Sequence, residues 1–566
     1  MKSVSGKNWE ELKNNQRLIE KIKIDHNLSH IQAKILLSRS FTETEIFSIK
    51  NKIDFKNPFS KNKDFLSACA LLKNNIEKKG SILIIGDYDV DGCISTALMV
   101  NFFKKINLNS HYFIPNRFRD GYGASKKLIK ELISKKKPDL VIFLDCGSNS
   151  HDAIKYINLL KIDSLIIDHH NIQKPYPEAK VFINPKKKFD YDNIDYLCSG
   201  FLTYLFLDLY INLNKLKVSI KEYLIYALLA TVADVMPIRG INMLLAKNVL
   251  RNFDINENFL FSSLFELLKI KKKIELDDLG FLIAPILNSA GRLDDANEVV
   301  KLLTIVSKKQ KIKILNNIYN LNKKRKLIEK KYLDDLDLSK ISKQNGIIFI
   351  YKSNISEGLI GILASKLKEY FNKPCIVFTN SGTILKGSAR SIVNFNISNY
   401  INKAIKEKII ISGGGHNLAA GVSLYKSNIK TFKNFLDNFY INKDLNLINN
   451  FTSELSINSI NTEFINNINI LGPFGNGNIN PIFLFSNIRF VKPLILKDKF
   501  ISCYIKSSNK IVRAISFNHL KSKISYEIIN CKTNVNLLAK VKENNWNNKK
   551  TIQLEIIDII KTSNKT

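Results

Sequence analysis

The scarcity of cysteine excludes two kinds of protein, those held together by disulfides and those with a cysteine-based zinc site. The chain has seven cysteines in 566 residues, an odd number, and none of them forms a C-x-x-C pair. Neither a disulfide framework nor a cysteine-based zinc site is therefore indicated, and we expect reduced, mostly buried thiols. No apolar run reaches the ~18 residues that span a bilayer, and the first residues lack the apolar core of a signal peptide. These absences predict a cytoplasmic protein.

Arginine is also scarce, with eleven residues against 75 lysines. The net charge of +35 favours a polyanionic partner, with nucleic acid the first candidate. The heavy use of Lys, Asn and Ile leaves a second explanation open, namely an AT-rich coding sequence. In such a sequence a remaining Arg can mark a position that needs a planar, bidentate group for phosphate. Arg117, Arg292 and Arg390 each lie in a motif rich in Gly, Asn or Ser.

Short apolar runs alternate with helical segments from Ser81 onward. The runs SILIIGD, LVIFLD and SLIID end at Asp87, Asp145 and Asp168, and this alternation predicts β-α-β units around a parallel sheet buried on both faces. A charged helical stretch follows at roughly residues 307–339, and a second α/β lobe comes after it. The last segments alternate apolar and polar residues, which predicts a small antiparallel barrel.

We therefore predict an α/β protein of two lobes joined by a long helix, with a barrel at the C-terminal end. The expected segments are an N-terminal helical segment (1–70), a catalytic domain (71–306), a connector helix (307–340), a substrate-binding domain (341–450) and the barrel (451–566). Aromatic residues of the barrel could stack on bases at ~1 to 3 kcal/mol each, although aromatic residues in strands are more often core. The candidates are Phe474, Phe483, Phe485, Phe490 and Tyr504.

Acidic residues follow each of the three early apolar runs. Ligands of an open parallel sheet collect at the carboxyl ends of its strands, so these carboxylates should converge. A further acidic residue lies near the end of an apolar helix, where a charge has no other evident reason. The predicted cluster comprises Asp87, Asp89, Asp91, Asp145, Asp168, His169, His170 and Asp234.

Oxygen ligands with imidazole suit Mn²⁺ or Mg²⁺ better than a zinc ion held by thiolates. Two ions ~3.5 to 4 Å apart could share a bridging Asp, activate water and stabilise an in-line displacement at phosphorus. Taken singly, D-x-D-x-D-G could be a calcium-type loop or an acidic turn, and His-His could be a satisfied strand end. Their order on successive strand ends favours a metal site.

Four strings resemble, in order, the motifs of the DHH phosphoesterase superfamily: GDYDVDG (86–92), LDCGS (144–148), IDHH (167–170) and TVADVMP (231–237). Five more strings are similar to those of the bacterial RecJ exonuclease family within it. They are PNRFRDGYG (115–123), LNSAGRLDDA (287–296), KGSARS (386–391), GGGHNLAAG (413–421) and LGPFGNGNINPIF (471–483). The resemblance runs from about residue 30 to the end of the sequence.

The resemblance implies a DHH catalytic domain, a DHH-associated domain and an OB-type barrel. It implies a 5′→3′ exonuclease that degrades single-stranded DNA to mononucleotides with two Mn²⁺ or Mg²⁺ ions. It also implies roles in DNA recombination, repair and mismatch repair, with a helicase and single-strand-binding protein as partners. We expect a monomer.

The resemblance also assigns roles to the eight residues of the predicted cluster. Asp89, Asp91, Asp145, His169 and Asp234 would be metal ligands, with Asp87 a ligand or its immediate support. His170 would face the scissile phosphate, and Asp168 would orient the histidine pair. His170, Asp168 and Asp145 are the expected catalytic residues.

The second lobe would bind the strand. Ser388 and Arg390, with Arg117 and Arg292, are candidates for holding the terminal 5′ phosphate and the backbone. His416 follows glycines whose N–H groups could approach a phosphate, although small residues in GGGHNLAAG could equally serve tight packing. The expected substrate-binding residues are Arg117, Asn288, Arg292, Ser388, Arg390, Gly414, Gly415 and His416.

The sequence departs from the RecJ pattern at positions outside the predicted cluster. Ile355 and Ser356 stand where Trp-His is usual, Lys366 where Arg is usual, Ile286 where Arg often occurs and Asn396 where His is usual. These departures bear on strand binding and processivity rather than on the chemistry.

Two other functions remain as alternatives. A hydrolase of short oligonucleotides or cyclic dinucleotides would share the four DHH motifs. A scaffold built on a decayed DHH fold would have lost metal carboxylates, whereas every expected carboxylate and histidine is present here.

Overall fold

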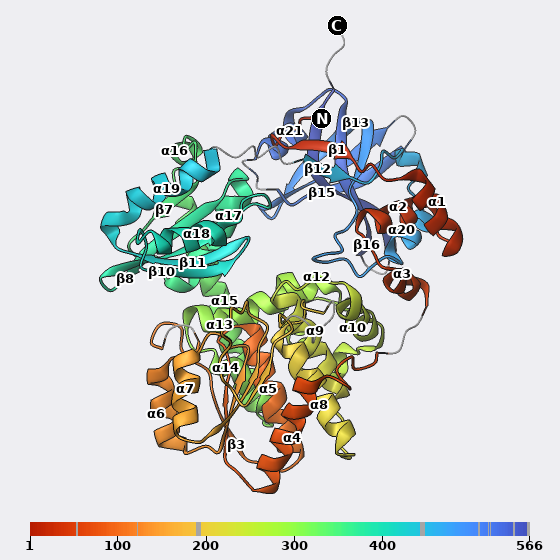
Figure 1. Ribbon diagram of the computed structural model, residues 1–566. Coiled ribbons are helices and arrows are strands. Elements are labelled where there is room, and N and C mark those ends of the chain that lie inside the picture. Colours follow the sequence, from red (N-terminus) through yellow and green to blue (C-terminus); the bar gives the residue numbers. More distant parts are fainter. Residues whose placement is uncertain are drawn as a thin grey trace. The chain divides into compact units, whose positions relative to one another are not determined.

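The structure is a computed structural model (Figure 1) that describes residues 1–51, 55–120, 123–187, 194–441, 448–507, 510–518, 520, 522–546 and 549–562. Gly121 and Tyr122, in the string PNRFRDGYG, lie outside the described residues. The chain divides into two compact units. Unit 1 comprises Met1–Ile53 and Ile441–Thr566, and unit 2 comprises Asp54–Tyr440.

The first lobe of unit 2 is built on a parallel five-stranded sheet with the order β3-β2-β4-β5-β6. Its strands are β2 (Ile82–Ile85), β3 (Ser110–Phe113), β4 (Leu140–Leu144), β5 (Asp163–Ile167) and β6 (Val181–Ile183). The side chains of successive strand residues point to opposite faces. Ile84 and Ile142 accordingly belong to one core, and Leu83 and Val141 to another.

Helices cover both faces of this sheet. The core on the Ile84 face includes residues of α4 (Lys63–Glu77), α5 (Val90–Lys105) and α8 (Ser199–Leu213), and the core on the Leu83 face includes residues of α6 (Lys126–Lys136) and α7 (His151–Leu159). β2 and β4 are buried throughout and β5 is buried after Asp163, which explains why these three strands read as apolar runs in the sequence. The predicted doubly covered parallel sheet is confirmed.

A helical layer completes the first lobe and leads to the second. It contains η1 (Lys221–Tyr223), α9 (Leu224–Ala233), α10 (Gly240–Asn252), η2 (Ile255–Glu257), α11 (Phe259–Leu267), α12 (Leu276–Asp278), the π-helix η3 (Leu279–Ile283), α13 (Ala284–Leu293) and α14 (Asn297–Thr304). The long helix α15 (Lys308–Asp334) follows, capped by Ser307, and then α16 (Leu338–Ser342). The long helix between the lobes is confirmed.

The second lobe has a mixed five-stranded sheet with the order β10-β11-β9-β8-β7. Among the described strands of this sheet, only β7 and β8 pair in parallel. Its elements are β7 (Ile348–Tyr351), α17 (Glu357–Phe371), β8 (Cys375–Ser381), β9 (Ile384–Arg390), α18 (Ile397–Lys406), β10 (Ser412–His416), β11 (Ala419–Leu424), η4 (Lys426–Asn428) and α19 (Ile429–Ile441).

Unit 1 contains a closed barrel with the strand order β13-β14-β15-β17-β16. The barrel strands are β13 (Phe483–Leu496), β14 (Phe500–Ser507), β15 (Lys510–Ser516), β16 (Val535–Trp546) and β17 (Lys549–Lys561), with α21 (Lys523–Asn530) before β16. Phe483, Phe485 and Phe490 are buried in its core, and Phe474 is partly buried against it. Tyr504 is the one stacking candidate that is exposed, at 44%.

The first residues of the chain belong to the same unit as the barrel. β1 (Asn8–Glu11) pairs in parallel with β12 (Ile448–Phe451). Around them lie α1 (Gln16–Asp25), α2 (His30–Ser38), α3 (Glu43–Lys50), η5 (Ile457–Ser459) and α20 (Thr462–Asn469). Residues of α2 and α3 share the hydrophobic core of the barrel strands.

A buried carboxylate fastens the N-terminal segment to the last strand of the barrel. Asp558 of β17 is 1% exposed and accepts hydrogen bonds from Ser3 Oγ (2.7 Å), Ser5 Oγ (2.5 Å) and Trp9 Nε1 (3.0 Å). A buried carboxylate is tolerated when several donors surround it. These bonds therefore tie residues 3–9 to a strand more than 500 positions later.

Among the described residues, no helix is long and apolar enough to span a membrane.

Candidate metal and phosphate-binding site

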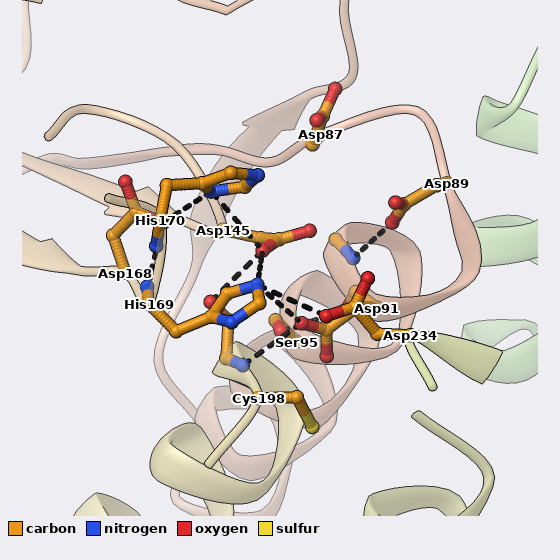
Figure 2. A network of polar contacts seen from close by, with 12 residues as sticks. Asp87, Asp89, Asp91, Ser95, Asp145, Asp168, His169, His170, Cys198 and Asp234 are labelled. Carbon is orange, nitrogen blue, oxygen red and sulfur yellow. Dashed lines mark hydrogen bonds and ion pairs between the residues drawn. The ribbon is translucent and has the colours of Figure 1, made fainter. Parts of the chain in front are cut away.

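The acidic residues predicted from the strand ends do lie together. Three groups have ligand atoms within 4.8 Å of one another: Asp145 with His169 and His170, Asp91 with His169 and Asp234, and Asp87 with Asp89 and Asp145. Asp145 and His169 each belong to two groups, so the groups form one continuous cluster. We call these seven residues the acidic cluster (Figure 2).

Asp145 connects the parts of the acidic cluster. It follows β4 with a positive φ of 61°, a conformation that Asp adopts more readily than most residues. Its Oδ1 lies 3.3 Å from His169 Nε2 and 3.9 Å from His170 Nδ1. Figure 2 shows the histidine pair on one side of Asp145, and Asp91 and Asp234 on the other.

The first turn of α8 supports two of these carboxylates, a role that the sequence patterns did not indicate. The N–H groups of Ser199 and Gly200 donate to Asp91 at 2.9 and 2.7 Å, and Ser199 Oγ donates to Asp145 at 3.0 Å. A helix N-terminus attracts an anion in this way. A Cβ at Gly200 would lie 2.9 Å from Asp91 Oδ1, which explains why glycine occupies this position.

Burial without an adequate counter-charge raises the pKa of the clustered carboxyl groups. Burial, followed by repulsion from Asp89, raises the pKa of Asp87 to about 7 and that of Asp91 to about 6. Burial, followed by repulsion from Asp91, raises the pKa of Asp145 and of Asp234 well above the ordinary value. A cation bound among these carboxylates would therefore stabilise their ionised form.

The histidine pair is divided by its environment into two different charge states. Burial lowers the pKa of His169 to about 3, and repulsion from His170 adds to this effect. Burial would also lower the pKa of His170, but the charge and 2.7 Å hydrogen bond of Asp168 outweigh it and raise that pKa to about 9. His170 and the N–H of Ser148 outweigh burial at Asp168 and keep the pKa of that carboxyl low. His169 is thus the neutral imidazole that a metal requires.

The donor set of the acidic cluster fits Mn²⁺ or Mg²⁺. It supplies carboxylate oxygens and imidazole nitrogens, which hard and borderline divalent ions prefer. The nearest thiols, Cys93, Cys146 and Cys198, are buried, and burial raises the pKa of each, so they are not thiolate ligands. The crowded carboxylates also provide the electrostatic reason for a bound cation.

We expect Mn²⁺ to stabilise the protein more at pH 8 than at pH 6. Metal ligands must be deprotonated, and the raised pKa values of Asp87 and Asp91 mean that protons compete with the metal at pH 6. At pH 8, a Mn²⁺ concentration of about 100 Kd should stabilise the fold by roughly 3 kcal/mol. Thermal melts of chelator-treated protein with and without Mn²⁺ at the two pH values measure the difference. An equal gain at both would contradict the electrostatic account of this site.

Three arginines, from the turn after β3, from α13 and from β9, gather beside the acidic cluster. Arg117 lies over the Tyr88 ring at 5.1 Å, Arg292 donates to the Gly358 carbonyl at 3.2 Å, and Arg390 donates to Ser388 Oγ at 3.0 Å. Burial lowers the pKa of Arg292 to about 10, with Arg117, Arg325 and Arg390 adding to the effect. Burial also lowers the pKa of Arg390, with Arg117 contributing. Among the described residues, none of these three lies within ion-pair distance of a carboxylate.

Close packing of α13 and α17 joins the two lobes at this arginine cluster (Arg117, Arg292 and Arg390). A Cβ at Gly358 would lie 2.1 Å from the Arg292 carbonyl oxygen, so only glycine permits the approach. Asn288, expected to bind substrate, accepts a hydrogen bond from the N–H of Val90 at 3.1 Å and so holds α13 to the start of α5. Gly414, Gly415 and His416 lie in β10, and His416 contacts Asn171 of the first lobe at 2.7 Å.

The residues that depart from the RecJ pattern have structural partners or core positions. Lys366 forms a 3.0 Å ion pair with Glu329 of α15, so a cation is retained there. Asn396 caps α18 by accepting from the N–H of Asn399, and Ser356 is the N-cap residue of α17. Ile286 and Ile355 are buried in hydrophobic cores.

Three family models match successive parts of the chain: the N-terminal domain of the DHH family over residues 81–231, the DHHA1 domain over 344–442 and the RecJ OB domain over 452–558. The single-stranded-DNA-specific exonuclease RecJ of Escherichia coli (strain K12) is 30% identical over 391 residues, covering 65% of this chain and 67% of the relative. The chain belongs to the RecJ family.

Other RecJ proteins extend the comparison. The single-stranded-DNA-specific exonuclease RecJ of Bacillus subtilis (strain 168) is 27% identical over 579 residues, covering 97% of this chain and 70% of the relative. A crystal structure of RecJ in complex with Mn²⁺ from Thermus thermophilus matches with a TM-score of 0.83 and 21% identity, over 98% of this chain and 80% of that one. A crystal structure of exonuclease RecJ bound to manganese matches with a TM-score of 0.59 and 25% identity, over 68% of this chain and 96% of that one.

These matches bear out the assignment of fold and enzyme class. The first lobe carries the DHH domain, the second the DHHA1 domain, and the barrel is the RecJ OB domain. The chain is a metal-dependent DHH phosphoesterase and a RecJ exonuclease homologue.

Proposed function

We propose that this RecJ-family chain removes 5′-mononucleotides from single-stranded DNA in the 5′→3′ direction. The observation that best supports this is the proximity of the arginine cluster to the acidic cluster. Asp89 lies near enough to Arg292 to oppose the lowering of its pKa, and Arg117 stacks on Tyr88, between Asp87 and Asp89 in the chain. A terminal phosphate held by the arginines would leave the next phosphodiester beside the carboxylates.

We further propose that the acidic cluster holds two ions, Mn²⁺ or Mg²⁺. Asp89, Asp91, Asp145, His169 and Asp234 are the proposed ligands, with Asp87 a ligand or its support. The overlap of three donor groups at Asp145 and His169 supports more than one ion. Bound metal would polarise the phosphodiester, lower the pKa of attacking water and neutralise the charge that develops on oxygen.

The protein residues have separate roles in the proposed reaction. The His170 cation, oriented by Asp168 at 2.7 Å, would stabilise negative charge on the scissile phosphate. Arg117, Arg292, Ser388 and Arg390 would hold the 5′ phosphate. Water adds to phosphorus, and the bond from phosphorus to the 3′ oxygen of the first nucleotide breaks. The released nucleotide keeps the original 5′ phosphate, and the remaining strand carries a new one.

This cycle regenerates the group that the arginine cluster would recognise, which supports repeated cleavage along one strand. The biological setting that we propose is cytoplasmic DNA recombination, repair and mismatch repair. A helicase and single-strand-binding protein would supply the strand, and a monomer would suffice for the reaction.

The decisive experiment uses one single-stranded DNA labelled at either its 5′ or its 3′ end, with Mn²⁺, with Mg²⁺ and with chelator. Rapid release of a 5′-labelled mononucleotide, lost with chelator and absent on blunt duplex, is the expected result. Failure on long strands with rapid cleavage of dinucleotides would assign the protein to the short-oligonucleotide class. Failure on both would favour a scaffold.

Replacing Arg390 with lysine should remove the preference for a phosphorylated 5′ end. Lysine keeps the charge but not the planar fork that binds a phosphate with two hydrogen bonds. We expect kcat/KM on 5′-phosphorylated DNA to fall by about 10- to 100-fold, the factor for about 1.4 to 2.7 kcal/mol, and to change little on 5′-hydroxyl DNA. Arg251→Lys, on α10, is the matched control. An equal loss on both substrates would exclude a terminal-phosphate role.

A further inference from the structure

The two lobes of unit 2 meet at a second polar contact, separate from the arginine cluster. Asn171 directly follows the histidine pair of the first lobe, and its Nδ2 lies 2.7 Å from Nδ1 of His416 in β10 of the second lobe. His416 is also close enough to affect the pKa of His169 electrostatically. The contact therefore brings an imidazole of the second lobe beside the acidic cluster.

Lys186 determines which end of the Asn171 amide faces His416. Its Nζ donates to Asn171 Oδ1 at 2.9 Å. An ammonium group has donors and no acceptor, so the amide oxygen must face Lys186 and the NH₂ group must face His416. His416 Nδ1 is then the acceptor, and a neutral imidazole in that arrangement carries its proton on Nε2.

A fully buried residue, Asn184, holds the backbone on either side of this contact. Asn184 is 0% exposed, and its Nδ2 donates to the His170 carbonyl and to Ser148 Oγ, both at 3.0 Å. Its Oδ1 accepts from the N–H of Lys186 at 2.9 Å. The loop after β6 thus fixes both the backbone beside Asn171 and the lysine that orients its side chain.

The surroundings of His416 favour the neutral ring. The His416 side chain is exposed in β10, but partial desolvation lowers its pKa, and the charges of Lys186 and His170 add to this effect. From its own lobe, Ser398 Oγ donates to the Gly415 carbonyl at 3.1 Å and steadies the backbone before His416. A neutral Nε2–H is a directed hydrogen-bond donor of a kind that can contact a phosphate oxygen.

We propose that Asn171, oriented by Lys186, is a positioning residue that holds His416 in its Nε2–H tautomer beside the acidic cluster, where this N–H donates to a phosphate oxygen of the bound strand. The inference rests on the proposed function for its substrate. The tautomer itself does not depend on that function, so the two can fail separately.

The tautomer is tested by long-range ¹H–¹⁵N correlation spectra of histidine-labelled full-length protein. The chain has eight histidines, and a His416→Gln spectrum identifies the signal. Wild type should show an unprotonated Nδ1. Asn171→Asp should move the proton to Nδ1, because a carboxylate can only accept. Lys186→Met should shift the signal partly, and Lys186→Arg, which still donates, should not.

Kinetics on single-stranded DNA supply the second readout. Asn171→Asp should lower kcat about tenfold, equivalent to one hydrogen bond of about 1.4 kcal/mol, while Lys186→Arg stays near wild type. Asn109→Asp, an exposed position before β3, adds the same charge elsewhere and should have no effect.

An unchanged His416 tautomer in Asn171→Asp would overturn the proposal. So would a changed tautomer with undiminished kcat. Wild-type protein without nuclease activity but with the Nε2–H tautomer would instead refute the proposed function.

Discussion

Asp145→Asn should abolish hydrolysis while leaving binding of single-stranded DNA nearly intact. Asparagine has the same shape and also tolerates the positive φ of 61°, so the backbone after β4 should not change. The substitution removes the carboxylate shared by two of the three donor groups. We expect kcat to fall by about 10²- to 10³-fold, the loss seen when a group that stabilises transition-state charge is removed.

Three measurements separate this loss from misfolding. Single-turnover nucleotide release gives the rate, fluorescence anisotropy with labelled DNA gives the affinity, and calorimetric titration with Mn²⁺ gives the metal bound. Asp163→Asn, at the opposite, amino end of β5, is the matched control and should retain activity. If Asp145→Asn kept more than a tenth of the wild-type rate, the acidic cluster would not be the catalytic centre.

Glu329→Gln should destabilise unit 2 by roughly 3–5 kcal/mol, the cost of breaking a buried ion pair by removing one partner. Glu329 is 3% exposed and lies 2.5 Å from Arg325 and 3.0 Å from Lys366. Arg325 is itself buried, with Asn322 as its other hydrogen-bond partner. Without the carboxylate, Arg325 of α15 would remain a buried charge with no ion-pair partner at Glu329.

The two tryptophans make this prediction specific to unit 2. Neither tryptophan lies in unit 2, and Trp9 is 3% exposed in unit 1, so tryptophan fluorescence should not follow the unfolding of unit 2. In urea, the circular-dichroism transition of unit 2 should move to lower concentration while the fluorescence transition does not. Glu369→Gln, which removes an exposed partner of Lys368, should change neither. A loss below about 1 kcal/mol in Glu329→Gln would show that the pair is solvated in solution.

The acidic cluster was predictable because its ligands follow local patterns. Each apolar run ends in a carboxylate, and parallel strands place their carboxyl ends at one edge of the sheet. Asp234 was predictable for a related reason, since a charge at the end of an apolar helix needs a partner. Its 3.4 Å approach to His169 supplies one.

The supporting residues could not be predicted in the same way. Ser199 and Gly200 donate backbone N–H groups to Asp91 at the start of α8, and no local pattern in the sequence shows which carboxylate such groups will meet. Asn171 and Lys186 act only because two loops come together, and asparagine and lysine are too common in this sequence to be noticed. The signal that could have been used is the string Cys-Ser-Gly before an apolar helix.

The segmentation of the sequence into five consecutive parts also gave no sign of the discontinuous unit 1. The pairing of β1 with β12 joins residues about 440 positions apart, and no local periodicity reports such a distance. Trp9 and Asp558 are informative only as a pair. Tertiary pairing of this kind is invisible to patterns that span ten or twenty residues.

Because residues 3–9 form hydrogen bonds to Asp558, the N-terminal segment can complete its fold only after β17 has been synthesised. Unit 2 lies wholly between the two halves of unit 1 in the chain, so both nuclease lobes can fold while the ribosome is still translating. At roughly 5–20 residues per second, the first helices must wait between about half a minute and two minutes for β17 to emerge. During that time the apolar residues of α2 and α3 have no barrel to cover them. A nascent chain that stops short of Asp558 would therefore display folded lobes beside an unassembled N-terminal segment, a form that chaperones and proteases can distinguish from the finished protein.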